Sequence, residues 1–173
     1  RFVSIIGPVG MGKTSLANAL MGEMAGATAV TKGTTQQQQD YRVAMPAING
    51  EIILSDSPGL LDAGATDEAS RTLATQADLL LYVVDNDLHR SQYEILRQLL
   101  AVGKRTLVVL NKIDLYTDGD AQLLVEQLRR RAGLDSEDVV AIAARPQDHP
   151  TPAVRALIAR IIVILRAAGR DLI

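Results

Sequence analysis

A glycine-rich segment near the amino terminus has the residue types and the spacing of a phosphate-binding loop. Residues 7–14 read Gly-Pro-Val-Gly-Met-Gly-Lys-Thr and fit the pattern G-x-x-x-x-G-K-[ST]. Glycines let successive backbone N–H groups converge on an anion, and the start of a following helix adds partial positive charge. We therefore predict that the phosphates of a nucleoside triphosphate are bound by Gly7, Val9, Gly10, Met11, Gly12, Lys13, Thr14 and Ser15.

Two side chains of this loop are expected to act on the ligand directly. Lys13 would reach the β- and γ-phosphates, and the hydroxyl of Thr14 would ligate Mg²⁺. A plain glycine-rich turn is the alternative. It is disfavoured because an apolar run at residues 2–6 precedes the loop and a helical pattern at 13–22 follows it, which is the setting that phosphate binding requires.

A second segment predicts which base is bound. Asn111-Lys112-Ile113-Asp114 follows an apolar run and so lies at the end of a strand, where open α/β sheets bind ligands. The Asp114 carboxylate can accept hydrogen bonds from N1–H and N2–H₂ of guanine, whereas adenine would place a lone pair against it. Asn111 would tie this segment to the phosphate-binding loop or reach N7, and the stem of Lys112 would cover the ring. Asp114 as a helix cap is the alternative.

Two further segments between these have the chemistry of a magnesium-dependent switch. Asp56-Ser57-Pro58-Gly59 follows an apolar strand, so Asp56 would hold Mg²⁺ through a water and the Gly59 amide would contact the γ-phosphate. Upstream, a threonine of Lys32-Gly33-Thr34-Thr35 would complete the magnesium shell only while the γ-phosphate is present. An ordinary turn and a polar surface loop are the alternatives for these two segments.

The order of these four segments resembles the G1 to G4 motifs of small GTP-binding domains, and their finer texture resembles the Era and TrmE group of bacterial GTPases. The matching pieces are residues 13–20, 33–35, 56–59, 83–85 and 111–114. The resemblance implies hydrolysis of GTP to GDP and phosphate, with Lys13, Thr35 and Gly59 as catalytic residues. It also implies Thr35, rather than Thr34, as the switch I magnesium ligand.

The same resemblance assigns a G5 motif and shows where this chain departs from the group. Ala143-Ala144-Arg145 stands where Ser-Ala-Lys is usual, so the Ala144 amide is expected to donate to guanine O6 without a serine to brace the loop. Leu60 replaces the glutamine that orients water in many signalling GTPases, and Gly10 replaces an asparagine linked to potassium-assisted catalysis. We therefore expect slow intrinsic turnover, stimulated by a partner or by a nucleotide-dependent dimer.

Composition limits the possible classes of function. The chain has 173 residues, of which 47% are hydrophobic and 3% aromatic, and its net charge is −2. These values predict one domain with an aliphatic core and give no basic footprint for nucleic acid. Cysteine is absent and no apolar run reaches the length of a membrane span. We expect a cytoplasmic domain, with membrane association of a longer protein left open.

The alternation of strand and helix patterns predicts a three-layer α/β/α fold with a six-stranded, mostly parallel sheet that contains one antiparallel strand. The expected strands are 2–6, 40–46, 51–55, 78–84, 105–110 and 138–142, and the expected helices are 13–22, 66–76, 88–102, 119–132 and 152–168. Asn49-Gly50 predicts a hairpin turn between the second and third strands. Arg129-Arg130-Arg131 is expected at an exposed helix end.

The two ends of the sequence suggest a domain taken from a longer chain. Arg1 almost begins the first strand without an initiator methionine, so we expect residues 1–173 to be a single GTP-binding domain. Five consecutive apolar residues at 161–165 predict a last helix that is buried all round or meets a partner. Two alternatives to a GTP hydrolase remain open: a GTP-gated interaction module with negligible hydrolysis, and an ATP-using enzyme, against which Asp114 argues.

Overall fold

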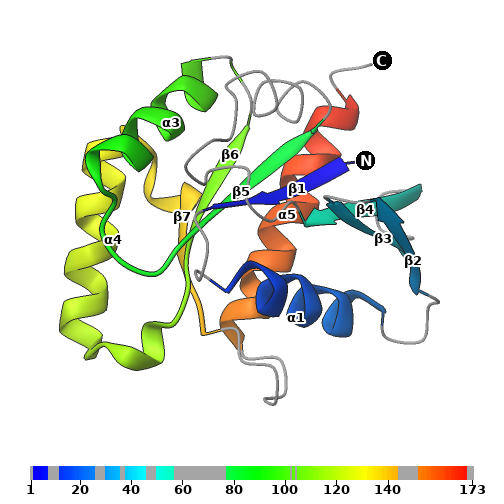
Figure 1. Ribbon diagram of the computed structural model, residues 1–173, viewed down its shortest axis with the longest axis horizontal. Coiled ribbons are helices and arrows are strands. Elements are labelled where there is room, and N and C mark those ends of the chain that lie inside the picture. The colour runs from blue at the N-terminus through cyan, green and yellow to red at the C-terminus, as the bar shows by residue number, and fades with distance from the viewer. Residues whose placement is uncertain are drawn as a thin grey trace.

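A seven-stranded sheet with helices on both faces forms the framework of the protein (Figure 1). The computed structural model describes residues 2–7, 12–25, 30–35, 38–45, 50–56, 77–101, 103, 105–143 and 152–170. The strands are β1 (Phe2–Ile6), β2 (Val30–Thr35), β3 (Gln38–Met45), β4 (Gly50–Asp56), β5 (Leu79–Val84), β6 (Thr106–Leu110) and β7 (Val139–Ala141). Their order in the sheet is β2-β3-β4-β1-β5-β6-β7. The predicted α/β class is therefore confirmed.

The sheet differs from the prediction on the side of β2. Strands β4, β1, β5, β6 and β7 form a parallel unit, and β3 pairs in antiparallel fashion with both β2 and β4. The prediction of six strands is wrong, because residues 30–35 form a seventh strand instead of a polar loop. Pairing with β3, from Val30↔Val43 to Thr35↔Gln38, stabilises this segment although Gly33 lies within it.

Two pairs of helices bury the two faces of the sheet. Helices α1 (Lys13–Ala25) and α5 (Pro152–Arg170) cover one face, and α3 (Arg90–Ala101) and α4 (Asp118–Ala132) cover the other (Figure 1). Strand β5 is buried on both sides because successive side chains point to opposite faces. Leu81 packs in the core beneath α1 and α5, whereas Tyr82 packs beneath α3 and α4.

Helix α1 continues past Gly22, where the sequence prediction ended it. Gly22 lies on the exposed side of the helix, and an internal glycine lowers helix stability by about 1 kcal/mol without ending the helix. The predicted helix at 66–76 and the predicted turn residue Asn49 lie outside the described residues. No helix built by the described residues combines the length and the apolar character that a bilayer crossing requires.

Helix α5 is buried on one side only, which corrects the alternative that it is buried all round. Ile161, Ile164 and Leu165 are buried, but Val163 between them is 54% exposed. The apolar run therefore contributes to the core with its inward side and leaves one apolar side chain in solvent.

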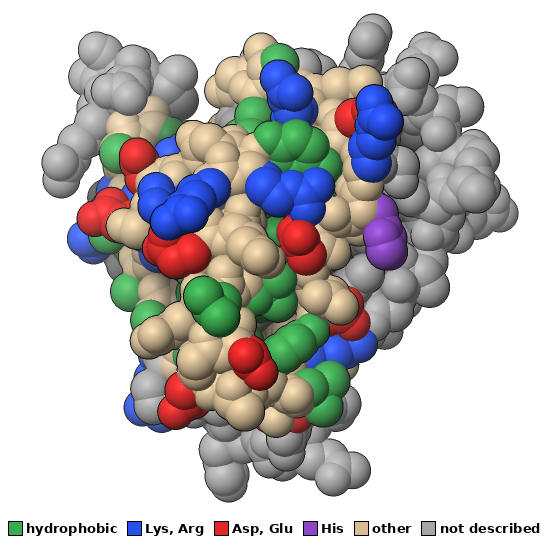
Figure 2. Space-filling view, turned by 90° about the vertical axis from the view of Figure 1, so that its left-hand side faces the viewer, with side chains coloured by type: hydrophobic (Ala, Val, Ile, Leu, Met, Phe, Trp, Pro, Cys, Tyr) green, Lys and Arg blue, Asp and Glu red, His purple; other side chains and the backbone are tan. Residues whose placement is uncertain are grey.

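Cationic and anionic side chains are interspersed on the face that α3 and α4 form (Figure 2). Arg129 pairs with Glu126 at 2.9 Å along α4. Arg131 instead contacts the residues just before α3, where its Nη1 lies 2.8 Å from Asp87 and donates to the Leu88 carbonyl at 3.0 Å. The predicted exposed helix end is thus corrected for Arg131, whose side chain is only 37% exposed and has specific partners.

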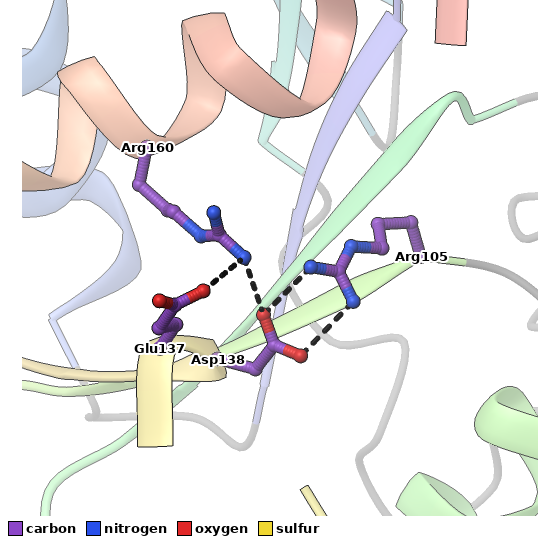
Figure 3. Close-up of polar contacts among 4 residues, drawn as sticks. All are labelled: Arg105, Glu137, Asp138 and Arg160. Atoms are coloured by element: carbon purple, nitrogen blue, oxygen red, sulfur yellow. Dashed lines mark hydrogen bonds and ion pairs between the residues drawn. The ribbon is translucent and has the colours of Figure 1, made fainter. Parts of the chain in front are cut away.

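A buried aspartate joins three elements at the edge of the sheet where β6 and β7 begin (Figure 3). The side chain of Asp138 is 3% exposed, and its two oxygens accept hydrogen bonds of 2.9 Å from Arg105. Arg160 of α5 lies 3.3 Å from Asp138 and 3.3 Å from Glu137. These four residues, the Asp138 cluster, fasten α5 to the beginnings of two strands.

Candidate nucleotide-binding site

The residues of the predicted segments lie along the opposite edge of the sheet, where the parallel strands end. Gly7 follows β1, Asp56 ends β4, Asp85 follows β5, Asn111 follows β6 and Ala143 lies just after β7. We call this the carboxyl edge. Open α/β sheets bind their ligands at this edge, since loops from several strands converge there.

Lys13 holds its ammonium group at the end of β1. It is the first residue of α1, it is 7% exposed, and its Nζ donates to the Gly7 carbonyl at 2.5 Å. Gly7 has a φ of +152°, and a Cβ at this position would collide with the carbonyl oxygen of Val83. A buried ammonium requires polar or anionic partners, so the amine is placed where a phosphate would be its natural ligand.

Gly12 brings the phosphate-binding loop into contact with the segment after β6. Gly12 is left-handed, with a φ of +84°, and a Cβ there would collide with Nδ2 of Asn111 and approach Cε of Lys112. Asn111 is fully buried, and its backbone N–H donates to the Val84 carbonyl at 2.7 Å. The structure therefore brings together the two segments that the sequence assigned to the phosphates and to the base.

Lys112 adopts a strained backbone conformation between these segments. Its φ and ψ are 61° and 33°, the left-handed region, and it is the one non-glycine residue with positive φ in the described part of the chain. This conformation costs a side-chain-bearing residue about 1–2 kcal/mol, and such strain persists only where neighbouring bonds hold it. Its Nζ lies 3.0 Å from Oδ2 of Asp85.

Asp114 lies in the 3₁₀ turn Ile113–Leu115 with its side chain exposed at the carboxyl edge. The Ile113 N–H donates to the Ile142 carbonyl at 3.1 Å, and the Ile142 N–H donates to the Leu110 carbonyl at 2.7 Å. Hence β7 holds the turn from the side, and Ala143 follows directly. Asp114 therefore has the exposure that a residue reading a base from solution requires.

The three predicted magnesium ligands have backbones near the same edge. Thr14 is the second residue of α1, Thr35 ends β2 and Asp56 ends β4. Through β3, Thr35 is registered with Gln38, and Asp56 is registered with the next residue, Gln39. Hydroxyl and carboxylate oxygens are ligands that Mg²⁺ prefers, so this donor set fits the ion. The side chains of Thr14, Thr35 and Asp56 lie outside the description.

Other predicted site residues fall outside the part of the chain that the structure describes. They are Val9, Gly10, Met11, Gly59, Leu60, Ala144 and Arg145. Ser15 lies in the first turn of α1 and is partly buried.

Sequence reasoning missed two residues that support the base-binding segment. In the sequence, Asp85 stands out only as the last residue of 83–85, a segment that matches the Era and TrmE group. Its carboxylate contacts Lys112. Tyr116 was not noted at all, and its hydroxyl donates to the Asp85 carbonyl at 2.5 Å. The sequence carries no local signal for this contact, because Tyr116 and Asp85 are 31 positions apart.

Comparison with known proteins identifies the family of the chain. A family model described as 50S ribosome-binding GTPase matches residues 2–112. The tRNA modification GTPase MnmE of Halorhodospira halophila is 31% identical over 182 residues, covering 98% of this chain and 35% of that protein. GTPase Era of Lacticaseibacillus paracasei is 30% identical over 133 residues, covering 72% of this chain and 43% of that protein. The chain thus spans less than half the length of these relatives.

Solved structures share the fold. The G domain of the T. maritima FeoB iron transporter aligns with a TM-score of 0.63 at 24% identity, covering 94% of this chain and 97% of that one. A probable GTP-binding protein engB aligns with a TM-score of 0.66 at 17% identity, covering 96% and 99%. At these identities the likeness concerns the fold alone.

Proposed function

Because the chain belongs to the 50S ribosome-binding GTPase family, we propose that its carboxyl edge binds GTP with Mg²⁺ and that hydrolysis to GDP switches the domain between two states. The observation that carries this proposal is the contact between Gly12 and Asn111. It joins a phosphate-binding loop to a base-binding segment, so one nucleotide can engage both at once.

The described residues supply three distinct functions in this proposal. Lys13 provides the cationic charge for the β- and γ-phosphates from its place beside Gly7. Asn111 fixes the distance between the phosphate and base subsites, and Asp114 reads the two donors of guanine. When bound, Mg²⁺ neutralises charge between the β- and γ-phosphates, and Thr14, Thr35 and Asp56 are the residues that would hold it.

Guanine selection is the first experiment. GTP and GDP should displace a fluorescent guanine nucleotide in the presence of Mg²⁺, whereas ATP should not compete at equal concentration. Asp114→Asn should shift the preference toward xanthine nucleotides, because the amide offers a donor to the additional oxygen of xanthine. Comparable inhibition of the wild type by ATP and GTP would overturn the proposal, and a variant that keeps its guanine preference would remove Asp114 from base reading.

Slow turnover is the second element of the proposal. Leu60 cannot orient a water, so we propose an Era-like switch whose intrinsic hydrolysis is slow and whose partner or second copy supplies the missing charge or water contact. A charge supplied in trans is worth roughly 10³- to 10⁵-fold in turnover. Turnover measured against protein concentration, in potassium and in sodium, tests this. Fast turnover at all concentrations without a partner would contradict it.

A GTP-gated interaction module with negligible hydrolysis is the second candidate, and Leu60 favours it for the same reason. Turnover of the longer protein separates the two candidates. Stimulated hydrolysis supports the switch, whereas partner capture by the GTP form without phosphate release supports the module.

A further inference from the structure

We propose that Tyr116 is a positioning residue for guanine-nucleotide affinity, acting through Asp85 on Lys112. This inference rests on the proposed function and deepens it by naming a residue outside the four predicted segments. The Tyr116 hydroxyl, the backbone and carboxylate of Asp85, and the Lys112 ammonium form a closed arrangement, which we call the Asp85 brace.

Asp85 makes two different contacts within the brace. Its backbone carbonyl accepts the Tyr116 hydroxyl at 2.5 Å, and its carboxylate lies 3.0 Å from the ammonium of Lys112. The carboxylate is 27% exposed and the lysine 35% exposed, so water screens their charges only in part. Tyr116 therefore holds the backbone of the residue whose side chain directs the lysine.

The brace spans the strained part of the base-binding segment. The Tyr116 N–H donates to the Ile113 carbonyl at 3.0 Å, and the Leu115 N–H donates to the Lys112 carbonyl at 3.0 Å. The segment from Lys112 to Tyr116 is thus closed by its own backbone bonds and anchored at both ends to Asp85. Strained residues at binding sites are retained when surrounding contacts over-determine them, and this closure provides those contacts for the left-handed Lys112.

The direction in which Lys112 lies explains why the brace bears on the base. The stem of Lys112 approaches Gly12, and its ammonium extends toward Asp85, so the stem bridges the phosphate-binding loop and the strand end of β5. A stem fixed in this way presents methylene groups to a base without losing side-chain freedom on binding. Releasing the brace should therefore weaken contacts to the base and leave contacts to the phosphates unchanged.

The test compares two tyrosine variants that each lose one hydroxyl-to-carbonyl hydrogen bond. Tyr116→Phe removes the bond to Asp85, and Tyr82→Phe, the matched control, removes a 3.0 Å bond to the Gln92 carbonyl in α3. GDP affinity is measured by calorimetry, and the inhibition constant of inorganic tripolyphosphate by competition. Tyr116→Phe should weaken GDP binding about 3- to 10-fold and Tyr82→Phe less than about 2-fold, since one such bond is worth about that factor. Tripolyphosphate should inhibit both variants as it inhibits the wild type.

A double-mutant cycle tests the route through Asp85. In an Asp85→Ala background the lysine has lost its carboxylate partner, so Tyr116→Phe should weaken GDP binding by a smaller factor than in the wild type. Equal factors in the two backgrounds would overturn the positioning role. Unchanged GDP affinity of Tyr116→Phe would also overturn it, as would equal losses for GDP and tripolyphosphate. A wild type that binds no guanine nucleotide would instead overturn the proposed function itself.

Discussion

The two edges of the central sheet both bury charged side chains, but they use them in different ways. At the edge where β6 and β7 begin, Asp138 has both oxygens occupied by Arg105 and a second arginine nearby. At the carboxyl edge, Lys13 is also buried, and its ammonium donates to the backbone carbonyl of Gly7. In the first arrangement, oppositely charged side chains pair with one another, and in the second an ammonium lies beside a backbone carbonyl at the strand end where we propose that phosphates bind.

Backbone conformation separates the two edges in the same way. Left-handed residues with crowded surroundings, Gly12 and Lys112, lie at the carboxyl edge. The Asp138 cluster instead rests on a short 3₁₀ turn, Ser136–Asp138, and on regular strands. Left-handed backbone thus marks the edge where we propose that the nucleotide binds, and paired charges mark the edge that we expect to stabilise the fold. Four predictions follow from this comparison, ordered from the largest expected effect to the smallest.

Removing the charge from the binding edge should have the largest effect. Lys13→Ala should weaken GTP binding by about 100-fold or more, because a charged contact to the phosphates is lost. The free energy of unfolding should change by less than about 1 kcal/mol, since the cost of burying the ammonium offsets much of what its contacts contribute to folding. Nucleotide titration and denaturant unfolding measure the two quantities. Normal GTP binding by the variant would contradict the assignment of the loop.

The opposite edge should give the reverse result. Asp138→Ala leaves Arg105 and Arg160 without their buried partner and should lower the free energy of unfolding by about 2–4 kcal/mol, with GDP affinity unchanged. Glu137→Ala is the control, because Glu137 contacts the same arginine with a 72% exposed side chain and should cost less than about 0.5 kcal/mol. If the folded Asp138→Ala variant lost GDP affinity, the claim that the Asp138 cluster affects stability and not nucleotide binding would be wrong.

Two left-handed glycines allow strain to be separated from crowding. Gly133→Ala places a Cβ on a backbone with a φ of +65° and with open space around it, which should lower the free energy of unfolding by about 1 kcal/mol. Gly12→Ala has a similar backbone cost, and its added Cβ would also collide with the side chain of Asn111. Its loss of unfolding free energy should therefore be roughly twice as large. Only Gly12→Ala should weaken GDP binding. Equal effects of the two variants in thermal unfolding and in nucleotide titration would contradict this expectation, because they would show that the Asn111 side chain can move away from the added Cβ at little cost.

The smallest effect is expected from an exposed ion pair on α4. The hydrogen bond from Arg129, together with its charge, holds the pKa of Glu126 below its ordinary value of 4.5. A carboxyl whose pKa is lowered by folding stabilises the protein above its ordinary pKa, and this contribution is lost as the pH falls through the folded-state value. In thermal unfolding at neutral pH, Glu126→Gln should therefore have a slightly lower midpoint temperature than the wild type. The difference between the two midpoints should vanish well below pH 4.5. A difference that grows on acidification would contradict the sign.

Sequence patterns predicted the parallel half of the sheet well because its strands are short apolar runs. Strand β6, predicted at 105–110, is found at Thr106–Leu110, and β5, predicted at 78–84, is found at Leu79–Val84. Buried parallel strands carry their signal in their own residues. The antiparallel side was harder to predict, because β2 contains a lysine, a glycine and three threonines and is stabilised by its pairing with β3.

The candidate site was predictable where function fixes residue type and spacing, as in residues 7–14 and 111–114. Its supporting contacts were not. Nothing in the local sequence links Tyr116 to Asp85, which are 31 positions apart and meet only because β5 and β6 are neighbours. The close approach of Gly12 to Asn111 likewise arises from tertiary packing, although the motif itself gives the general expectation that Asn111 ties the two loops.

The central place of β1 has a consequence for synthesis of the protein. Within residues 1–173 this strand is made before both of its neighbours in the sheet, which are β4, at residues 50–56, and β5, at residues 79–84. Until translation has passed the second of these, the apolar strand Phe2–Ile6 has at least one unpaired edge, which is a surface on which strands of other chains can pair. We therefore expect the sheet to form only after residue 84 has been synthesised, with β1 as a segment that chaperones must shield until then.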